Sequence, residues 1–279
     1  LWRVGCALVA ALAAGALAPP AGAADASAAD DDCAAIRRAS GFRGGGFEAV
    51  GRLTASYRFG WSGITAAHGR VALDRQHDTE TLRGEVATVG LARLLWSLDG
   101  TIAGSSSVRG QPREFSQSER YRSRTKRIEI VFERGGFRTW KWRVPGEVRP
   151  GTPRRTQLGG VHSLHSALLG IRSLPLNIGE RDSLLVTPAR TVYLVALEVL
   201  GREPVTAAGR EWRALKLDID IRKRTGSGEL VPHGKLGRTT AWLSDDRLRL
   251  PLRIEADVFI GFVFAELASY QPPRPASRN

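Results

Sequence analysis

Strict alternation of apolar and polar residues dominates the chain from about residue 50 and most constrains its fold. In the first such run, Leu53, Ala55, Tyr57, Phe59 and Trp61 alternate with Arg52, Thr54, Ser56 and Arg58. The same period of two recurs over residues 128–132, 215–221 and 250–258. Successive side chains of a strand point to opposite faces, so the pattern predicts antiparallel strands with one apolar and one solvated face. The predicted class is mostly β: a single strongly curved antiparallel sheet that forms an open or partly closed barrel.

The apolar face of such a sheet must pack against another layer. Two segments have the apolar spacing of a helix rather than of a strand. One contains Val161, Leu164, His165, Leu168 and Leu169, and the other is the shorter run of residues 91–98. We therefore expect one or two short helices packed on the concave side of the sheet.

The first 23 residues have the parts of a secretory signal peptide. Arg3 precedes an uncharged apolar stretch over residues 4–18, and Ala21 and Ala23 flank Gly22 in a small-residue cleavage site. The stretch is shorter than the roughly 20 residues of a membrane-spanning helix. We expect export to the periplasm and no transmembrane segment after cleavage; an uncleaved N-terminal anchor is the alternative.

The remaining chain divides into three predicted parts. Residues 24–47 predict a flexible leader, residues 48–270 a single β-rich domain, and residues 271–279 a disordered tail. Cleavage after Ala23 removes Cys6 and leaves Cys33 as the only thiol, so the mature chain has no internal disulfide. Cys33 is then either free or a bridge in a dimer, and the oligomeric state stays open.

Basic residues are concentrated in one stretch of the sequence. The 279-residue chain has a formal net charge of +13, and residues 113–155 hold 13 basic against five acidic side chains. Our candidate face for an anionic ligand consists of Arg120, Arg122, Arg124, Lys126, Arg138, Lys141 and Arg143. In an extended chain, the first four would share one side. Because an exported protein does not meet nucleic acid, lipid head groups or anionic wall polymers are the expected partners. A solvated face without a ligand is the alternative.

Signatures of catalysis and metal binding are missing from the sequence. It contains no nucleophile elbow, zinc-protease helix motif, phosphate-binding loop or dinucleotide glycine pattern. His162 and His165 are spaced to share a metal on a helix, but no cysteine or carboxylate nearby in sequence completes a ligand shell. We favour a hydrogen-bonded core position for His165. The prediction is therefore no enzyme, with no catalytic residue, no metal and no cofactor.

A motif near the C-terminus resembles that of a known family. Its residues are Trp242, Ser244, Asp245, Asp246, Pro251, Arg253 and Gly261. Together with segments 57–67, 166–179 and 208–221, they resemble a bacterial exported family catalogued as domain of unknown function 3108, over about residues 50–270. The resemblance implies a curved antiparallel sheet wrapped around helical segments, similar to the unclosed barrels of envelope lipid and lipoprotein carriers. It implies no established activity.

The residues of the motif are of types that form turns. Ser244, Asp245 and Asp246 are residues whose side chains bond to nearby backbone, and they lie between two predicted strands. Pro251 suits an edge or entry position of a strand. A carboxylate pair for acid–base chemistry is the alternative for Asp245 and Asp246, but adjacent residues in a strand point apart.

Two functions from different classes follow. The first is a non-enzymatic binding or carrier module that holds a lipid or a lipidated envelope component in the apolar concavity. The second is a structural or assembly factor of the cell envelope. It would recognise a protein or an anionic wall polymer through its outer face, with the concavity filled by its own side chains.

Overall fold

The computed structural model describes residues 26–44 and 52–274. The predicted signal peptide, residues 1–23, lies outside this part, as do residues 24–25 and 45–47 of the predicted leader and residues 275–279 of the predicted tail. Within the described residues, no helix is long and apolar enough to cross a membrane.

Sixteen strands and three helices make up the described chain. The first eight strands are β1 (Arg52–Trp61), β2 (Ile64–Gln76), β3 (Thr79–Thr88), β4 (Leu98–Ser107), β5 (Pro112–Tyr121), β6 (Arg124–Glu133), β7 (Gly136–Val144) and β8 (Arg154–Thr156). The others are β9 (Val161–His162), β10 (Arg181–Val186), β11 (Tyr193–Ala207), β12 (Arg210–Arg224), β13 (Leu230–Pro232), β14 (Thr239–Ser244), β15 (Pro251–Asp257) and β16 (Phe262–Arg274). The helices are α2 (Ala26–Ser40), α3 (Gly90–Leu95) and α4 (Leu164–Arg172).

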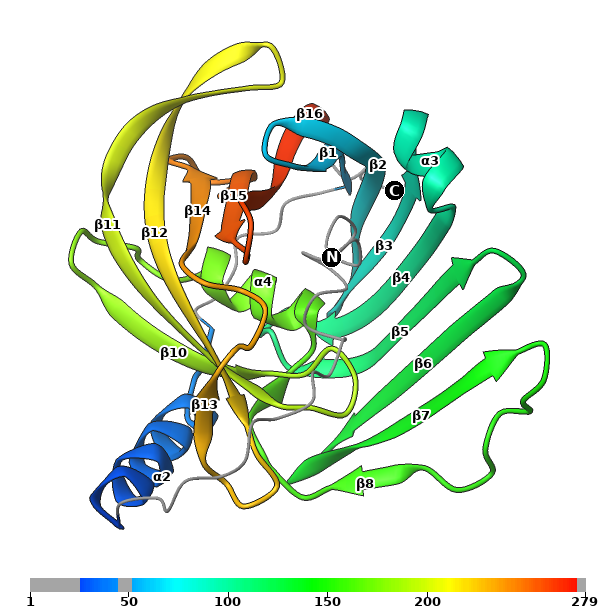
Figure 1. The fold of residues 1–279 in the computed structure, drawn as a ribbon. Coiled ribbons are helices and arrows are strands. Elements are labelled where there is room, and N and C mark those ends of the chain that lie inside the picture. Colours follow the sequence, from blue (N-terminus) through cyan, green and yellow to red (C-terminus); the bar gives the residue numbers. More distant parts are fainter. Residues whose placement is uncertain (1–25, 45–51, 275–279) are drawn as a thin grey trace.

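All strands belong to one strongly curved sheet (Figure 1). Its order is β8-β7-β6-β5-β4-β3-β2-β1-β16-β15-β14-β12-β11-β10-β9, with β13 attached to β12. The neighbours pair antiparallel except β9 and β10. The path does not close on itself, which confirms the predicted mostly β class and open, curved sheet. The last strand includes residues 271–274, where the sequence predicted a disordered tail.

Helix α4 fills part of the concave side, as the sequence predicted (Figure 1). It begins at Leu164 because Ser163 caps it: Ser166 N donates to Ser163 Oγ, and Ser163 N donates to Ser166 Oγ. Val161, which the apolar spacing included in the helix, lies in β9 instead. Ala167 of α4 packs with Phe42 and with apolar side chains of β10, β11, β12 and β14.

The sheet curls so far that β10 and β11 are buried on both faces. Leu184 and Val195 face α4, whereas Leu185 and Leu194 pack against apolar side chains of β5, β6 and β7. Helix α2 extends this second core with Ala39. Residues 26–40 are therefore helical where the sequence predicted a flexible leader, because an apolar stripe of α2 is covered by strands distant in sequence. Cys33 lies exposed on α2.

Helix α3 takes a different position from the one predicted for residues 91–98. It lies at the ends of β3 and β4 rather than on the concave side (Figure 1). None of its residues is buried, and its leucines point into solvent. Only α4 of the two predicted helical segments therefore covers the concave face.

His162 and His165 are both buried in this core. A Cβ on Gly104 of β4 would lie 3.0 Å from His165 Cβ, so the glycine leaves room for α4. The prediction of a hydrogen-bonded His165 is wrong: neither ring nitrogen has a hydrogen-bond partner in the described part of the chain. Burial, with Arg43 near His162 and Arg172 near His165, lowers the pKa of each histidine to about 4.

We expect the buried histidines to destabilise the protein in mild acid. The unfolded chain binds protons on both side chains near pH ~6.5 while the folded chain excludes them, so stability falls from there towards pH ~4. Between pH ~7 and pH ~4.5, the unfolding free energy of the His165→Leu variant should fall by roughly 2 kcal/mol less than that of the wild type. Urea unfolding across this pH range measures the difference. His77→Asn, at an exposed turn, is the control, and parallel profiles for wild type and H165L would contradict the expectation.

Candidate functional site

An apolar pocket remains on the inner face of β1–β5, beyond the part that α4 fills. Its volume is about 50 Å³, which is room for roughly four water molecules. Apolar side chains and glycines line most of it: Phe59, Gly69, Val71, Gly84, Val86, Leu98, Gly100 and Ile102. The pocket is a candidate site for an apolar group.

Glycines at inward-facing positions shape this pocket. Gly69 of β2 pairs with Val86 of β3, which pairs in turn with Gly100 of β4. A Cβ on Gly69 would lie 2.8 Å from the Phe59 ring, and one on Gly100 would lie 2.9 Å from Val86. The sequence pattern indicated glycines at bends of the sheet, but it did not reveal that they align across neighbouring strands.

One end of the pocket is polar. Gln117 and Glu119 of β5 line it, and Gln117 Nε2 donates to a Glu119 carboxylate oxygen. Lys126 Nζ lies 3.2 Å from the other carboxylate oxygen of Glu119. Lys141 lies near this group, and burial, reinforced mainly by the positive charge of Lys126, lowers the pKa of Lys141. The pocket therefore combines an apolar interior with a cationic end.

The candidate anionic-ligand face is divided by the fold. Residues 121–124 form a hairpin turn in which Arg122 has a φ of 54°. The prediction that the first four cations share one side, as they would in an extended chain, is therefore wrong. Arg120 points outward to Asp99, with 2.6 Å between Arg120 Nη2 and Asp99 Oδ2. Arg138 also lies on the outer face, beside Glu133.

The other cations of this set face inward. Arg124 and Lys126 lie on the inner side of β6, and Lys126 is paired in register with Arg143 of β7. Lys141 lies opposite Ile128, which is fully buried in the core. Lys126 and Lys141 are thus the members of the predicted set that reach the polar end of the pocket.

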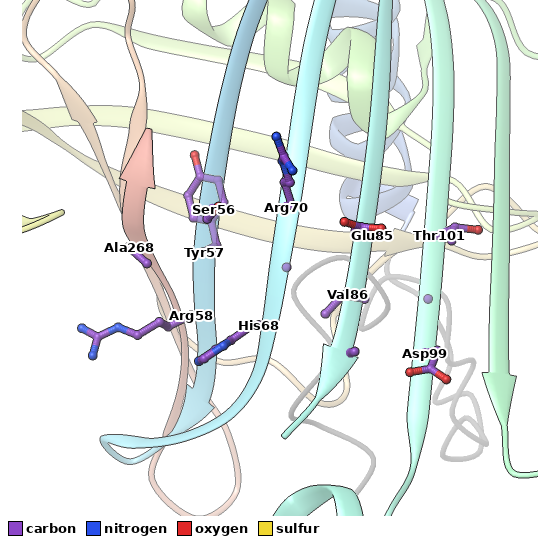
Figure 2. A pocket seen from close by; sticks show the side chains of 13 residues that line it. Ser56, Tyr57, Arg58, His68, Arg70, Glu85, Val86, Asp99, Thr101 and Ala268 are labelled. Carbon is purple, nitrogen blue, oxygen red and sulfur yellow. The ribbon is translucent and has the colours of Figure 1, made fainter. Parts of the chain in front are cut away.

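A second, open groove runs over the outer face of β1–β4 (Figure 2). Its volume is about 540 Å³, and an adjoining groove of about 1130 Å³ shares Arg70, Glu85 and Thr101 with it. Ion pairs occupy part of its wall, since Arg58 bonds Glu266 at 2.6 Å and hydrogen bonds from Arg93 and Arg120 lower the pKa of Asp99 to about 2. The side chains are those of a solvated sheet face, so we place the candidate ligand site inside.

The family motif forms the turn between β14 and β15. Asp246 Oδ1 accepts hydrogen bonds from the backbone N–H groups of Leu248 and Arg249, and Ser244 Oγ accepts one from Leu250 N. Asp245 instead pairs with three arginines, at 2.9 Å from Arg202 Nε, 3.1 Å from Arg213 Nε and 3.6 Å from Arg249 Nη1. These contacts hold the turn and do not bring the two carboxylates to a common substrate.

Other motif residues also make structural contacts. Trp242 Nε1 donates to Glu203 Oε1 at 2.6 Å, and the Arg253 guanidinium lies 5.9 Å from the Trp242 ring. Pro251 begins β15, which pairs on both sides, so it marks an entry and not an edge of the sheet. Gly261 has a φ of 73° in the turn between β15 and β16.

A buried polar cluster that the sequence did not indicate surrounds Arg172, the last residue of α4. Its guanidinium donates to the Leu248 carbonyl, with 3.0 Å from Nε. Burial lowers the pKa of Arg172 to about 10, against the opposing effect of Tyr57 and Glu80. Burial also raises the pKa of both Tyr57 and Glu80. The cluster ties α4 to the β14–β15 turn and so stabilises the plug of the concavity.

The histidine pair does not form a metal site with other described residues. No group of three or more His, Cys, Asp or Glu side chains in residues 26–44 and 52–274 could hold a metal ion. His162 instead packs edge-on against Phe42, with 5.5 Å between ring centroids.

A solved structure of another family shows the same type of fold. A β-barrel-like protein of domain of unknown function DUF1849 from Brucella abortus is 11% identical, with a TM-score of 0.55 over 82% of this chain and 100% of its own. A candidate lipoprotein from Parabacteroides distasonis has a TM-score of 0.38, with 10% identity over 81% of this chain and 97% of its own. A candidate exported protein from Bacteroides fragilis has a TM-score of 0.35, with 9% identity over 82% and 99%. The latter two scores are too low to establish a shared fold.

The sequence comparisons identify the family and no activity. No curated protein matches the chain. The family model of a protein of unknown function, DUF3108, matches residues 55–268, which include the inner pocket, helix α4 and the β14–β15 turn. The chain therefore belongs to the DUF3108 family.

Proposed function

We propose that this protein is an exported, non-enzymatic binding or carrier module that holds the acyl chain of an anionic lipid or lipidated envelope component. The observation that carries the proposal is the inner pocket, whose apolar lining ends at Gln117 and Glu119 beside Lys126 and Lys141. Pockets that bind small molecules combine an apolar lining with a few placed polar groups. A pocket of about 50 Å³ takes the end of one alkyl chain, so the rest of the ligand extends towards the two lysines.

The chemistry of the pocket supports binding and not turnover. The Gln117 amide and the Glu119 carboxylate line its polar end, and the ammonium groups of Lys126 and Lys141 lie beside them and can orient a head group. The Gln117 Oε1 atom is buried without a hydrogen-bond partner among the described residues, so it is available to a ligand donor. An activated nucleophile needs an adjacent base, and the pocket lining pairs no such groups.

A structural or assembly factor is the second candidate. It is favoured by the extent to which the concavity is already filled, because α4 packs with β10, β11, β12 and β14 in a continuous core. In that case the pocket is a packing imperfection, and the protein purified from its envelope has the mass of the chain alone in native mass spectrometry. A co-purifying lipid mass is the outcome expected of the carrier.

Filling the pocket should abolish acyl-chain binding. Val71→Phe places a ring in the pocket, and we expect at least roughly tenfold weaker binding of the fluorescent fatty acid cis-parinaric acid. Ala72→Phe is the matched control, because residue 72 lies next in β2 and lines the outer groove. Thermal unfolding checks that both variants fold. Equal affinities for wild type, V71F and A72F would contradict the pocket assignment.

The cationic end should select for a charged head group. Lys141→Gln removes one positive charge, so binding of oleate should weaken several-fold while binding of methyl oleate changes little. Displacement of cis-parinaric acid measures both affinities. Lys235→Gln, in the loop after β13, removes the same charge away from the pocket. If K141Q and K235Q reduce oleate binding equally, the head group does not bind at Lys141.

A further inference from the structure

Most of the exposed apolar side chains lie at one end of the strands, around the connections between them. Eight of the twelve large apolar side chains that are exposed in the described chain lie in the connections at this end or at the strand ends beside them. We call them the apolar rim: Trp61, Ile64, Leu91, Leu94, Leu95, Tyr121, Phe259 and Ile260. Scattered exposed apolar residues are ordinary, whereas a cluster marks an interaction surface. We propose that the apolar rim docks onto the surface of an anionic lipid bilayer.

The apolar rim is continuous in space. Its residues belong to the β15–β16, β1–β2, β3–β4 and β5–β6 connections, which follow one another along the sheet order. Trp61 Nε1 donates to Ile260 O at 2.7 Å, and Val89 N donates to Ala66 O at 2.9 Å. The Trp96 and Tyr121 ring centroids are 6.2 Å apart, which joins the last two connections. Figure 2 shows the β1–β2 connection and α3 together at the lower ends of the strands.

The β15–β16 turn holds its apolar residues out in solvent. Phe259 is 94% exposed. Gly261 has a φ of 73°, and a Cβ there would lie 2.1 Å from Ser62 Oγ, so only glycine allows the two turns to meet. Ser62 N donates to Phe262 O at 2.8 Å across this contact. The motif glycine therefore fixes a projecting apolar turn that contributes nothing to the core.

Helix α3 presents its apolar face to solvent instead of to the sheet. Leu91, Leu94 and Leu95 follow the spacing of one helix face and are 78%, 82% and 62% exposed. A surface helix normally turns such a face inward. Arg93 pairs with Asp99 of β4 and fixes the helix in this orientation. A short helix with three exposed leucines fits a surface that supplies the missing apolar layer.

Positive charge next to the apolar rim points to an anionic bilayer. Arg122 and Arg124 lie at the β5–β6 connection and make no ion pair with any described residue, and the Arg122 guanidinium lies 5.4 Å from the Tyr121 ring. Apolar side chains flanked by arginines, with Trp and Tyr among them, are typical of proteins that lie in the interface of acidic membranes. The apolar residues sit on separate projecting turns, which a fluid bilayer can accept one by one. This inference does not rest on the acyl-binding pocket, since a protein with an empty pocket would still dock.

Vesicle flotation of the full chain tests the apolar rim. We expect binding to vesicles of phosphatidylcholine with phosphatidylglycerol and weaker binding to phosphatidylcholine alone. Leu94→Glu with Phe259→Glu should reduce binding at least roughly tenfold. Ile178→Glu with Leu200→Glu is the matched control, because these residues are exposed away from the apolar rim. All of these proteins keep residues 4–18, so any binding through that apolar stretch is common to them.

A second pair of double variants tests the arginines beside the apolar rim. Arg122→Ser with Arg124→Ser should weaken binding to the anionic vesicles by about fivefold for each arginine. Arg154→Ser with Arg155→Ser, in β8, removes the same charge at the opposite end of β7 and should have little effect. Equal losses for the two pairs would mean that net charge, and not the apolar rim, governs binding, which would overturn the proposal.

A fluorophore attached at single positions shows directly which part of the protein contacts the membrane. In a chain with Cys6→Ser and Cys33→Ser, an environment-sensitive fluorophore on Phe259→Cys should shift its emission to the blue when anionic vesicles are added, and one on Ile178→Cys should not. An unchanged emission at residue 259 would overturn the proposal. So would a loss of self-association in the L94E/F259E variant with vesicle binding intact, since the apolar rim would then be an interface between copies of the chain.

Discussion

The apolar inner face of a single, unclosed sheet must be removed from water, and the rest of this structure depends on how that is done. A flat sheet of this size would leave the whole face exposed. Here the sheet curls until β10 and β11 lie over β5–β7, and α4 fills the space between the two halves. The hydrophobic effect thus holds the curvature, because straightening the sheet would expose both cores at once.

Coverage by one nine-residue helix is incomplete, and this explains the location of the pocket. The α4 side chains reach the inner faces of β4, β5 and β10 but stop short of the end where Phe59 and Leu98 lie. Glycines at inward positions of β2–β4 keep that space from being filled by the sheet itself. The end of α4 is held by the hydrogen bond from Arg172 to the Leu248 carbonyl, with Tyr57 and Glu80 near the same guanidinium.

The apolar rim and the inner pocket lie at the same end of the sheet. Trp96, which contacts Tyr121 of the apolar rim, packs against the core cluster that contains Phe59 and Leu98, and these two residues line the pocket. A membrane held at the apolar rim would therefore lie next to the pocket that we propose for an acyl chain. The outer groove of β1–β4, with its ion-paired arginines, faces away from both and provides the solvated side of the protein.

Alternation along single strands determined the fold class and most inward-facing residues, because it depends only on neighbours in the chain. The apolar spacing from Leu164 to Leu169 likewise identified the helix in the concavity, and the turn chemistry of Ser244 and Asp246 required no distant partner. Helix α2, by contrast, is covered by β10 and by other strands distant in the sequence, and its composition alone indicated a flexible leader. The pocket and the apolar rim were also beyond the sequence, since each gathers residues from several strands or turns. Local pattern specified which face of each strand is apolar; only the tertiary structure decided which parts of that apolar surface are covered, because coverage depends on how the sheet curls and where α4 ends.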